Sequence, residues 1–323
     1  MYKGMLLRNV VAFIAIAGLI CGSGFYKTSA ADNDSSSLPA GNDVNSDLPK
    51  EITTSTGIEF VLIPAGEFTM SYRKYKGSKM PLRDDLRQLQ EHEKKEHEKK
   101  LLEHIDIVFR DVLENGNRAF ETKSRRVIIT KPFYLGKYPV TQRQWTEILD
   151  SNPSKYTDNP DNPVENVSWD DAQEFISLIN KKESTSRYRL PTSAEWEYAS
   201  AGMLTLSFWG KDLSQIEKYG WFKGNSDGKT HPVGMKLPNK WNLYDMLGNV
   251  SEWVQDKFDS SKGIDEYDDE PILVDPIRQP TSSYHMLHGG AWNSETVSYP
   301  LSAAPGIVPN DGDFGIRLAL YID

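Results

Sequence analysis

The sequence predicts an α+β domain that is rich in loops and poor in regular secondary structure. Three observations support this prediction. Short β-rich runs begin near residue 58, three helices marked by capping residues lie between residues 141 and 201, and the last third of the chain is mostly loop and short strand, full of Gly, Pro, Asn and Trp. A chain with so few regular ladders needs another means of fixing its loops, and a bound ion would provide one.

The composition indicates a globular protein without a nucleic-acid-binding groove. The chain has 323 residues, enough for one large domain or two ordinary ones, and 38% of them are hydrophobic. Its net charge of −9 argues against a nucleic-acid partner, because such binding relies on clustered Lys and Arg. Cys21 is the single cysteine, which excludes a disulfide, a thiolate zinc site and an intrachain redox pair.

Residues 1–31 have the pattern of a signal peptide. Lys3 and Arg8 give a positive start, residues 10–20 form an apolar run too short to span a bilayer comfortably, and Ser29-Ala30-Ala31 supplies the small residues that a signal peptidase requires. We therefore expect cleavage after one of these two alanines. The protein is then exported, to the periplasm or outside the cell, with no transmembrane helix in the mature chain.

Cys21 offers an alternative, because it follows the apolar run, where a lipid-modified cysteine would stand. The preceding Gly18-Leu19-Ile20 is a poor lipoprotein box, which normally has a large apolar residue followed by two small ones. We therefore favour cleavage over lipid anchoring at Cys21. The mature protein then contains no cysteine.

A linker separates the signal from the folded domain. Residues 32–50 are rich in Ser, Asn and Asp and have almost no apolar residues, so they cannot bury enough surface to offset the cost of ordering. The domain is expected over residues 51–323. Its first element is expected to be a hairpin of the β-rich runs 58–63 and 67–70 around Pro64-Ala65-Gly66.

Residues 81–114 are expected to form an inserted, charged helix. Apolar residues recur at helical spacing near both ends, and Glu–Lys pairs four residues apart fill the middle. The segment is also a candidate for docking a partner. A metal site on His92, His97 and His104 is disfavoured, because spacings of five and seven put these side chains on different faces of a helix.

From residue 127 the pattern changes to strands followed by helices. Strands are expected over residues 127–130 and 133–140. Each of the three helices opens with a capping box or near-box, in which a hydroxyl and an acid or amide three residues later satisfy free amides of the first turn. These boxes are Thr141…Gln144, Ser168…Asp171 and Thr192…Glu195, and the helices are expected to run to about residues 149, 183 and 201.

The stretch from Asn242 to Trp253 combines two carboxylates with two turn-forming residues. Asp245 and Glu252 bracket Gly248-Asn249, a pair that tolerates positive φ and so permits a sharp backbone reversal. Such a reversal would point main-chain carbonyls the same way as the two acids, in an all-oxygen cage of the kind that calcium prefers. A buried turn with core aromatics is the alternative.

Six short motifs follow one another in a fixed order along the domain. They are Lys137-Tyr138-Pro139-Val140-Thr141, Pro163-Val164-Glu165-Asn166-Val167-Ser168-Trp169, Arg189-Leu190-Pro191-Thr192-Ser193-Ala194-Glu195-Trp196-Glu197, Gly248-Asn249-Val250-Ser251-Glu252-Trp253, Gly289-Gly290-Ala291-Trp292 and Gly315-Ile316-Arg317. Over residues 58–323 this set resembles the formylglycine-generating enzyme (sulfatase-modifying factor) domain family. The resemblance implies a variant of the C-type lectin fold, loop-rich α+β with bound calcium, which the helix 81–114 interrupts.

The resemblance further implies one structural calcium site. Its ligands would be the side chains of Asp245 and Glu252 and the main-chain carbonyls of Gly248 and Val250. A second calcium site of the family uses an Asn where Trp221 stands in this chain, so no second ion is expected.

The chemistry that the resemblance implies depends on thiols that this chain lacks. The family's oxidases convert a substrate cysteine into formylglycine with two cysteines that bind copper, a metal whose Cu(I) form suits soft thiolate ligands. Ser294 and Tyr299 stand at the matching positions, so neither copper nor this oxidase activity is expected. The iron-dependent sulfoxide synthase relatives need a separate His-bearing helical domain, which the insertion is too short to supply. Ser294 is expected to be a loop serine, because no nucleophile elbow surrounds it.

Two functions are compatible with these observations. The first is an exported, non-catalytic module that binds a peptide, glycan or partner protein on the surface formed by residues 285–313. Its candidate contacts are Tyr284, His285, His288, Trp292, Asn293, Ser294, Tyr299, Asn310 and Asp311. The second is a periplasmic oxidoreductase of the family that acts on a secreted peptide or natural product by a cysteine-independent mechanism. The sequence leaves open whether any enzyme activity survives.

Overall fold

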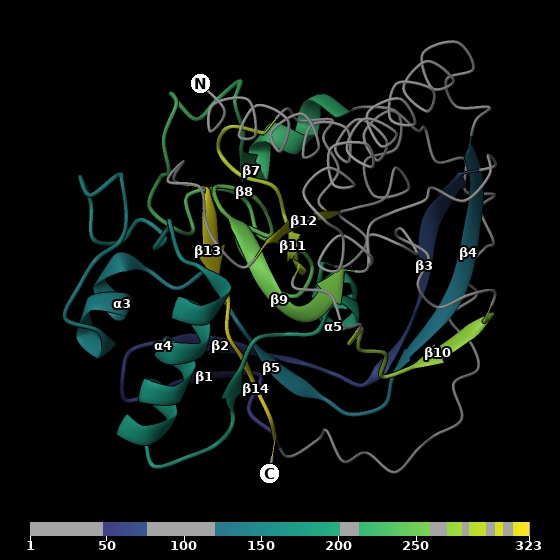
Figure 1. Ribbon diagram of the computed structural model, residues 1–323, viewed down its shortest axis with the longest axis horizontal. Helices are drawn as coiled ribbons and strands as arrows, with labels where there is room; N and C mark the ends of the chain where they lie inside the picture. The colour runs from purple at the N-terminus through teal and green to yellow at the C-terminus, as the bar shows by residue number, and fades with distance from the viewer. Residues whose placement is uncertain are drawn as a thin grey trace, which may run out of the picture.

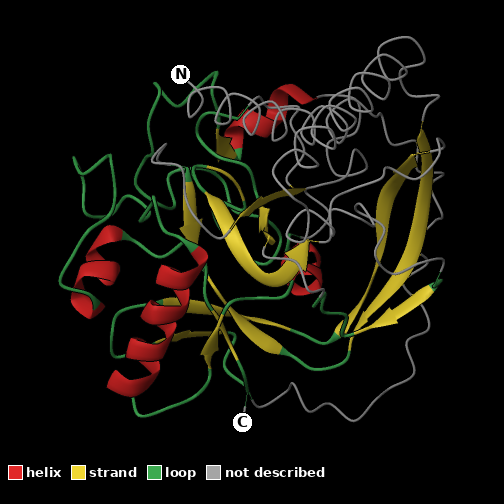
Figure 2. Cartoon of the chain, in the orientation of Figure 1, coloured by secondary structure: helices red, strands yellow, loops and turns green. Residues whose placement is uncertain are grey.

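In the computed structural model, the described strands fall into four small sheets, and helices are short and few (Figures 1 and 2). The structure describes residues 48–75, 120–200, 213–258, 270–279, 284–294, 301–305 and 313–322. This confirms the prediction of an α+β fold with little regular secondary structure. The predicted signal peptide, most of the linker and the predicted helix 81–114 lie outside the described residues.

The largest sheet has five strands in the order β1-β2-β5-β14-β6, all antiparallel to their neighbours. Their bounds are Glu51–Thr53 for β1, Glu59–Ile63 for β2, Phe133–Gly136 for β5, Ala319–Leu320 for β14 and Tyr188–Arg189 for β6. This sheet joins the two ends of the domain, because β14 near the end of the chain lies between β5 and β6 (Figure 1).

A second sheet projects from the domain as a wing (Figure 1). Its order is β10-β4-β3, with bounds Ile272–Val274 for β10, Phe120–Ile129 for β4 and Gly66–Tyr75 for β3. β3 and β4 are antiparallel and paired from Gly66↔Ile129 to Tyr75↔Phe120, whereas β10 runs parallel to β4.

The remaining strands carry the region of the predicted site. A four-stranded sheet has the order β12-β11-β9-β13, with bounds Leu301–Pro305, Tyr284–His288, Ser251–Phe258 and Phe314–Ile316. A short parallel pair joins β7, Gly220–Trp221, to β8, Leu247–Gly248. β9 therefore begins within the predicted calcium loop, and β13 directly precedes Arg317.

The predicted hairpin of runs 58–63 and 67–70 is wrong, although both runs form strands. β2 pairs with β1 and β5, whereas β3 pairs with β4. Residues 64 and 65 therefore form a corner at which the chain passes from one sheet into another. These pairings are favoured over a β2–β3 hairpin because β5 offers four buried residues to β2, and β4 pairs with β3 over ten residues.

The three predicted helices form where they are expected (Figure 2). They are α3, Gln142–Ile148; α4, Trp169–Lys182; and α5, Ser193–Ala199. Each opens with the predicted capping box, with both its side-chain and backbone bonds in place. A short 3-10 helix, η2, spans Leu213–Lys218.

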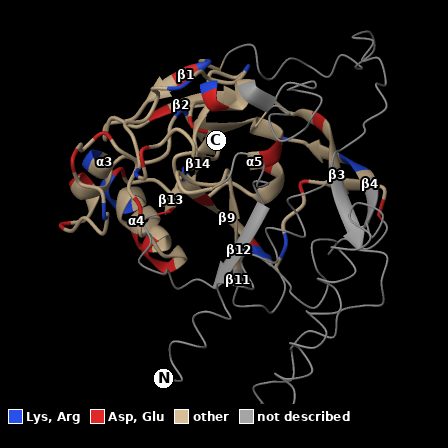
Figure 3. Ribbon diagram, turned by 90° about the horizontal axis from the view of Figure 1, so that it is seen from above, with Lys and Arg blue, Asp and Glu red and all other residues tan. Residues whose placement is uncertain are grey.

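Charges on α4 complement the helix dipole. Asp170 and Asp171 occupy its first turn, and Lys181 and Lys182 its last. Figure 3 shows acidic and basic residues interspersed along α3 and α4. None of the helices in the described parts of the chain is both long and apolar enough to cross a membrane.

The sheet that contains β9 and β11 separates two hydrophobic cores. Trp253 and Leu287 face the core around α3 and α4, where Trp145 stacks on Phe175 with ring centroids 4.9 Å apart. Val254 of β9 and Met286 of β11 face the other core, which α5 covers. Alternate residues of a strand point to opposite faces, so both faces of these two strands are buried.

Candidate functional site

The loop from residue 242 to residue 253 makes the predicted backbone reversal. Asp245, Gly248 and Asn249 have φ values of 52°, 71° and 63°. Gly248 cannot be replaced without rearrangement, because a Cβ there would lie 2.2 Å from the carbonyl oxygen of Trp221. The close parallel pairing of β7 with β8 therefore requires glycine at this turn.

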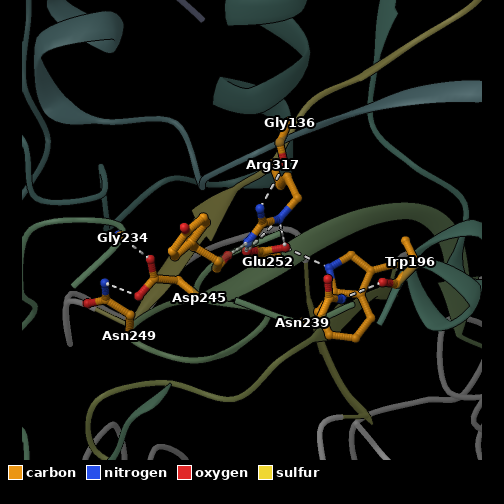
Figure 4. Close-up of polar contacts among 10 residues, drawn as sticks. Gly136, Trp196, Gly234, Asn239, Asp245, Asn249, Glu252 and Arg317 are labelled. Carbon is orange, nitrogen blue, oxygen red and sulfur yellow. Dashed lines mark hydrogen bonds and ion pairs between the residues drawn. The ribbon is translucent and has the colours of Figure 1, made fainter. Parts of the chain in front are cut away.

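Glu252 lies at the centre of a buried ion pair (Figure 4). Nη2 of Arg317 donates to Oε1 at 2.8 Å, and Nε donates to Oε2 at 2.9 Å. The indole Nε1 of Trp196 donates to Oε2 at 2.6 Å. Both side chains of the ion pair are 0% exposed. Two further guanidinium hydrogens reach main-chain carbonyls, with Nη1 donating to Gly136 at 2.8 Å and Nη2 to Tyr244 at 2.7 Å.

Asp245 has its own donors and does not share them with Glu252. The amide of Gly234 donates to Oδ2 at 2.7 Å, and Nδ2 of Asn249 donates to Oδ1 at 3.3 Å (Figure 4). Burial raises the pKa of Asp245 to about 6, against the lowering effects of the Gly234 amide and of Arg317.

The two carboxylates implied as calcium ligands do not fit that ion as they are arranged, because protein donors already use their oxygens. Each oxygen of Glu252 already accepts from protein donors, and the neutralising cation is Arg317. Both oxygens of Asp245 also accept hydrogen bonds. Within the described ranges, no group of three or more His, Cys, Asp or Glu residues is placed to hold a metal. Calcium binding stays a prediction of the resemblance, and the guanidinium supplies a positive charge at this position.

Ser294 closes a tight turn of the loop that follows β11. Its Oγ accepts from the amide of Ala291 at 2.9 Å, and its own amide donates to the carbonyl of Ala291 at 3.0 Å. Its carbonyl accepts from the amide of Lys223 at 3.0 Å. A hydroxyl in this position holds the loop, and the role of Ser294 as a ligand contact stays a prediction. Tyr299, the other position matched to a family cysteine, lies outside the described residues.

Trp292 connects this loop to two other segments. Its amide donates to the carbonyl of Asn249 at 3.0 Å, and its carbonyl accepts from Oγ of Ser226 at 2.9 Å. Its ring meets the ring of Tyr156 edge-on, with centroids 5.3 Å apart. The backbone of Trp292 is thus anchored on both sides while its half-buried ring rests on the loop after α3.

Asn293 and Asp313 lie at the outer edge of this loop. Asn293 is exposed, and its Nδ2 lies 3.4 Å from Oδ2 of Asp313. Asp313 begins the final described segment and its carbonyl accepts from the amide of Ser251 at 2.7 Å. The structure therefore brings Trp292, Asn293, Ser294 and Asp313 together at one surface.

Glu165 is a buried acid beside this surface that the sequence reasoning did not single out. The side chain is 0% exposed, and its Oε1 accepts from the amide of Tyr156 at 2.7 Å. Its Oε2 is buried without a hydrogen-bond partner. The only sequence signal was an acid in the otherwise apolar Pro163-Val164-Glu165 run.

Two candidate contacts, His285 and His288, are not presented to a ligand surface. His285 is 7% exposed and stacks on Trp169 at 4.0 Å, and His288 is 1% exposed and stacks on Trp196 at 4.8 Å. The expectation that they line the binding surface is therefore wrong, because both faces of β11 are covered. For Tyr284 the structure describes only the backbone, which pairs with Phe258 and Pro305. Asn310 and Asp311 lie outside the described residues.

A polar network fills the core beneath the sheet. Nε2 of His288 lies 2.8 Å from Oγ of Ser193, whose amide donates to Oδ2 of Asp256 at 2.7 Å. Burial raises the pKa of Asp256 to about 6 and lowers that of His288 to about 3. The serine–histidine pair resembles part of a catalytic triad, but both side chains are buried, so it serves packing between α5 and β11.

Residues 45–322 match the family described as the sulfatase-modifying factor enzyme 1-like domain. The chain belongs to this family. Its membership agrees with the motif order, and its single cysteine means that it is a member without the catalytic cysteine pair. The family therefore accounts for the fold.

Individual relatives in the family carry different names. The chaperone protein LppX of Paenibacillus barcinonensis is 28% identical over 260 residues, which cover 62% of this chain and 86% of that protein. The formylglycine-generating enzyme of Streptomyces coelicolor is 32% identical over 51% of this chain and 55% of the enzyme. The chain thus spans about half the length of that enzyme.

Solved structures show the same fold. Treponema denticola variable protein 1 superposes with a TM-score of 0.58 at 22% identity, over 84% of this chain and 99% of that one. PvdO from Pseudomonas aeruginosa gives a TM-score of 0.57 at 22% identity, over 84% and 98% of the two chains. At this level of identity the likeness establishes architecture only.

Proposed function

We propose that this chain is a non-catalytic binding module of the sulfatase-modifying factor family, which presents the Trp292 surface to a peptide, glycan or protein partner. The Trp292 surface is defined as Tyr156, Trp292, Asn293, Ser294 and Asp313. The observation that carries the proposal is the state of Ser294. Its hydroxyl is used to close its own loop, and the thiol of the family's oxidases is missing.

The construction of the surface supports a binding role. Trp292 is anchored through its backbone to Asn249 and Ser226, so its ring is held on a fixed framework. Aromatic residues in such positions contribute large contact areas at low entropic cost. Ligand contacts commonly lie on loops that a rigid scaffold positions. The relative named as a chaperone, matched over most of its length, is in keeping with a protein that acts by binding another.

A glycan and peptide array tests this proposal. We expect the wild-type chain to bind a defined subset of probes and Trp292→Ala to weaken that binding at least tenfold, because a central aromatic anchor is lost. Tyr321→Ala is the matched control, since Tyr321 is an exposed aromatic residue at 57% exposure in another part of the domain. The control should bind like the wild type. No binder on either array would contradict the proposal.

Metal analysis of the purified chain distinguishes a binding module from the alternative function, a cysteine-independent oxidoreductase. A cysteine-independent oxidoreductase needs a redox cofactor or metal near Ser294, so copper or iron at about one equivalent would favour it. We expect neither metal at that level. Export to the periplasm or outside the cell, and partner docking by residues 81–114, remain proposals that rest on the sequence pattern alone.

A further inference from the structure

The side chain of Glu165 is held in a position where only one of its two carboxylate oxygens accepts a hydrogen bond. The backbone before it is fixed, because Val164 donates its amide to the carbonyl of Val140 at 2.9 Å. Its own amide donates to Oγ of Ser154 at 3.2 Å. Oε1 accepts from the Tyr156 amide at 2.7 Å, and Oε2 has no partner although it is buried. A buried, unsatisfied carboxylate oxygen costs folding free energy, and a ligand that donates a hydrogen bond to it would offset that cost.

A chain of contacts links Glu165 to the residues of the Trp292 surface. Tyr156, which binds Oε1 through its backbone, packs its ring against Trp292. Asn293 follows Trp292 and approaches Asp313. Burial raises the pKa of Glu165 most strongly, the amides of Tyr156 and Lys155 and the charge of Lys155 oppose it, and the charge of Asp313 adds a smaller upward effect. Glu165 is therefore joined to the aromatic pair through the backbone of Tyr156, and Asp313 through the neighbour of Trp292.

We propose that Glu165 and Asp313 recognise a cationic group, a primary ammonium or a guanidinium, on the ligand that occupies the Trp292 surface. The inference rests on the proposed binding function and names the class of ligand. A charged nitrogen would donate to Oε2 of Glu165, the oxygen that the protein leaves unsatisfied. The rings of Tyr156 and Trp292 would contribute cation–π attraction beside it.

An organic cation fits this arrangement better than a metal ion. Calcium takes six to eight oxygen ligands, whereas this surface offers two carboxylates and two aromatic rings. The described part of the chain places no third His, Cys, Asp or Glu beside them in a metal-binding group. Lys155 lies over the Tyr156 ring, with its Nζ 5.2 Å from the ring centroid. The amide and the charge of Lys155 both lower the pKa of Glu165, and each of these effects is larger than the opposite effect of Asp313.

The test uses two small probes that differ in one charge. N-acetyl-lysine methylamide and N-acetyl-norleucine methylamide have side chains of similar length, and their dissociation constants can be followed by the NMR shift of the Trp292 indole. We expect the lysine probe to bind at least tenfold more tightly, because a hydrogen bond to a charged group is worth about 1.5–3 kcal/mol. N-acetyl-arginine methylamide should show the same preference.

Variants locate the preference on the two acids. Glu165→Gln keeps the acceptor for the Tyr156 amide and removes the charge, so it should abolish the tenfold preference, and Asp313→Asn should reduce it. Asp161→Asn, an exposed acid on the same loop, is the control and should leave the preference unchanged. Thermal unfolding of each variant verifies that it is folded. If Glu165→Gln fails to fold, Asp313→Asn decides the question.

The outcomes separate this inference from the proposed function. Equal affinity for the lysine and norleucine probes, or a preference that survives Glu165→Gln, would overturn the cation site. If array ligands bind in a Trp292-dependent way but show no preference for cations, the binding function is supported and the cation site is refuted. A Glu165-dependent preference in a chain without array ligands would support the site and refute the broader function.

Discussion

Arg317 and Glu252 form a fully buried ion pair that joins the end of β13 to the start of β9. The guanidinium also caps the main-chain carbonyls of Gly136 and Tyr244, which belong to two other segments. One side chain therefore ties four parts of a loop-rich domain together. Its energetic value depends on every partner being present, since a buried charge without its counter-charge is strongly unfavourable.

Replacing Arg317 with methionine should destabilise the fold by about 3–5 kcal/mol, because the carboxylate of Glu252 is then buried without a cation. Urea unfolding followed by tryptophan fluorescence measures the loss. Arg143→Ala is the control: this arginine pairs with Asp161 at the surface, and its removal should cost under about 1 kcal/mol. Adding Glu252→Gln to Arg317→Met should restore part of the stability. A double variant as unstable as the single one would refute the buried-charge explanation.

Calcium should leave the stability of the chain unchanged. The oxygens of Glu252 are already occupied by Arg317 and Trp196, so no vacant ligand set remains at this side chain. Thermal unfolding in excess calcium and in a chelator should give the same midpoint. An ion present at ~100 times its Kd would instead add about 2.7 kcal/mol. A rise of that size, lost in Asp245→Asn, would support the calcium loop implied by the family resemblance.

His285 should make the fold sensitive to mild acid. Burial lowers the pKa of His285 to about 4, with Lys257 lowering it further and Asp170 opposing. In the unfolded chain histidine titrates near 6.5, so the unfolded state takes up a proton first as the pH falls, and folding stability is lost from pH 6.5 down to about 4.

His285→Phe keeps an aromatic ring against Trp169 and removes the titration. Between pH 7.5 and pH 5 the wild type should lose about 2 kcal/mol more stability than this variant. Urea unfolding at the two pH values measures the difference. An equal loss in both proteins would show that His285 does not carry the effect.

The capping box of α4 should stabilise the domain measurably. Oγ of Ser168 accepts from the amide of Asp171 at 3.0 Å, and Oδ2 of Asp171 accepts from the amide of Ser168 at 2.9 Å. Ser168→Ala should cost about 1 kcal/mol in chemical unfolding. Ser151→Ala, at an exposed position outside the helices, should change the free energy of unfolding by less than about 0.5 kcal/mol. A cost at Ser168 no larger than at Ser151 would argue that the cap adds nothing.

Features of the fold that depend on neighbouring residues were predictable from the sequence. The three helices begin at capping boxes only four residues long, and each starts and ends close to its predicted position. The reversal at Gly248-Asn249 was predictable because few residues tolerate positive φ. Both features are specified locally, without reference to the rest of the chain.

Features that depend on distant partners were not predictable in this way. The strands β2 and β3 form as expected but pair with β5 and β4, not with each other. Glu252 finds its cation 65 residues further along the chain. The burial of His285 depends on cores packed against both faces of β11, and strand sequence alone does not state how many faces are covered.

The wing formed by β3 and β4 has a consequence for the modularity of this domain. Tyr75 and Phe120 are directly paired at its outer end, so the chain departs and re-enters at adjacent backbone positions. The length of polypeptide between them can change without displacing any strand of the two cores. A two-residue Asn-Gly turn would close the same ladder, and a foreign domain could be spliced in at that point. The tip of this hairpin is therefore a site at which a sequence can be inserted or exchanged while the β3–β4 ladder is kept.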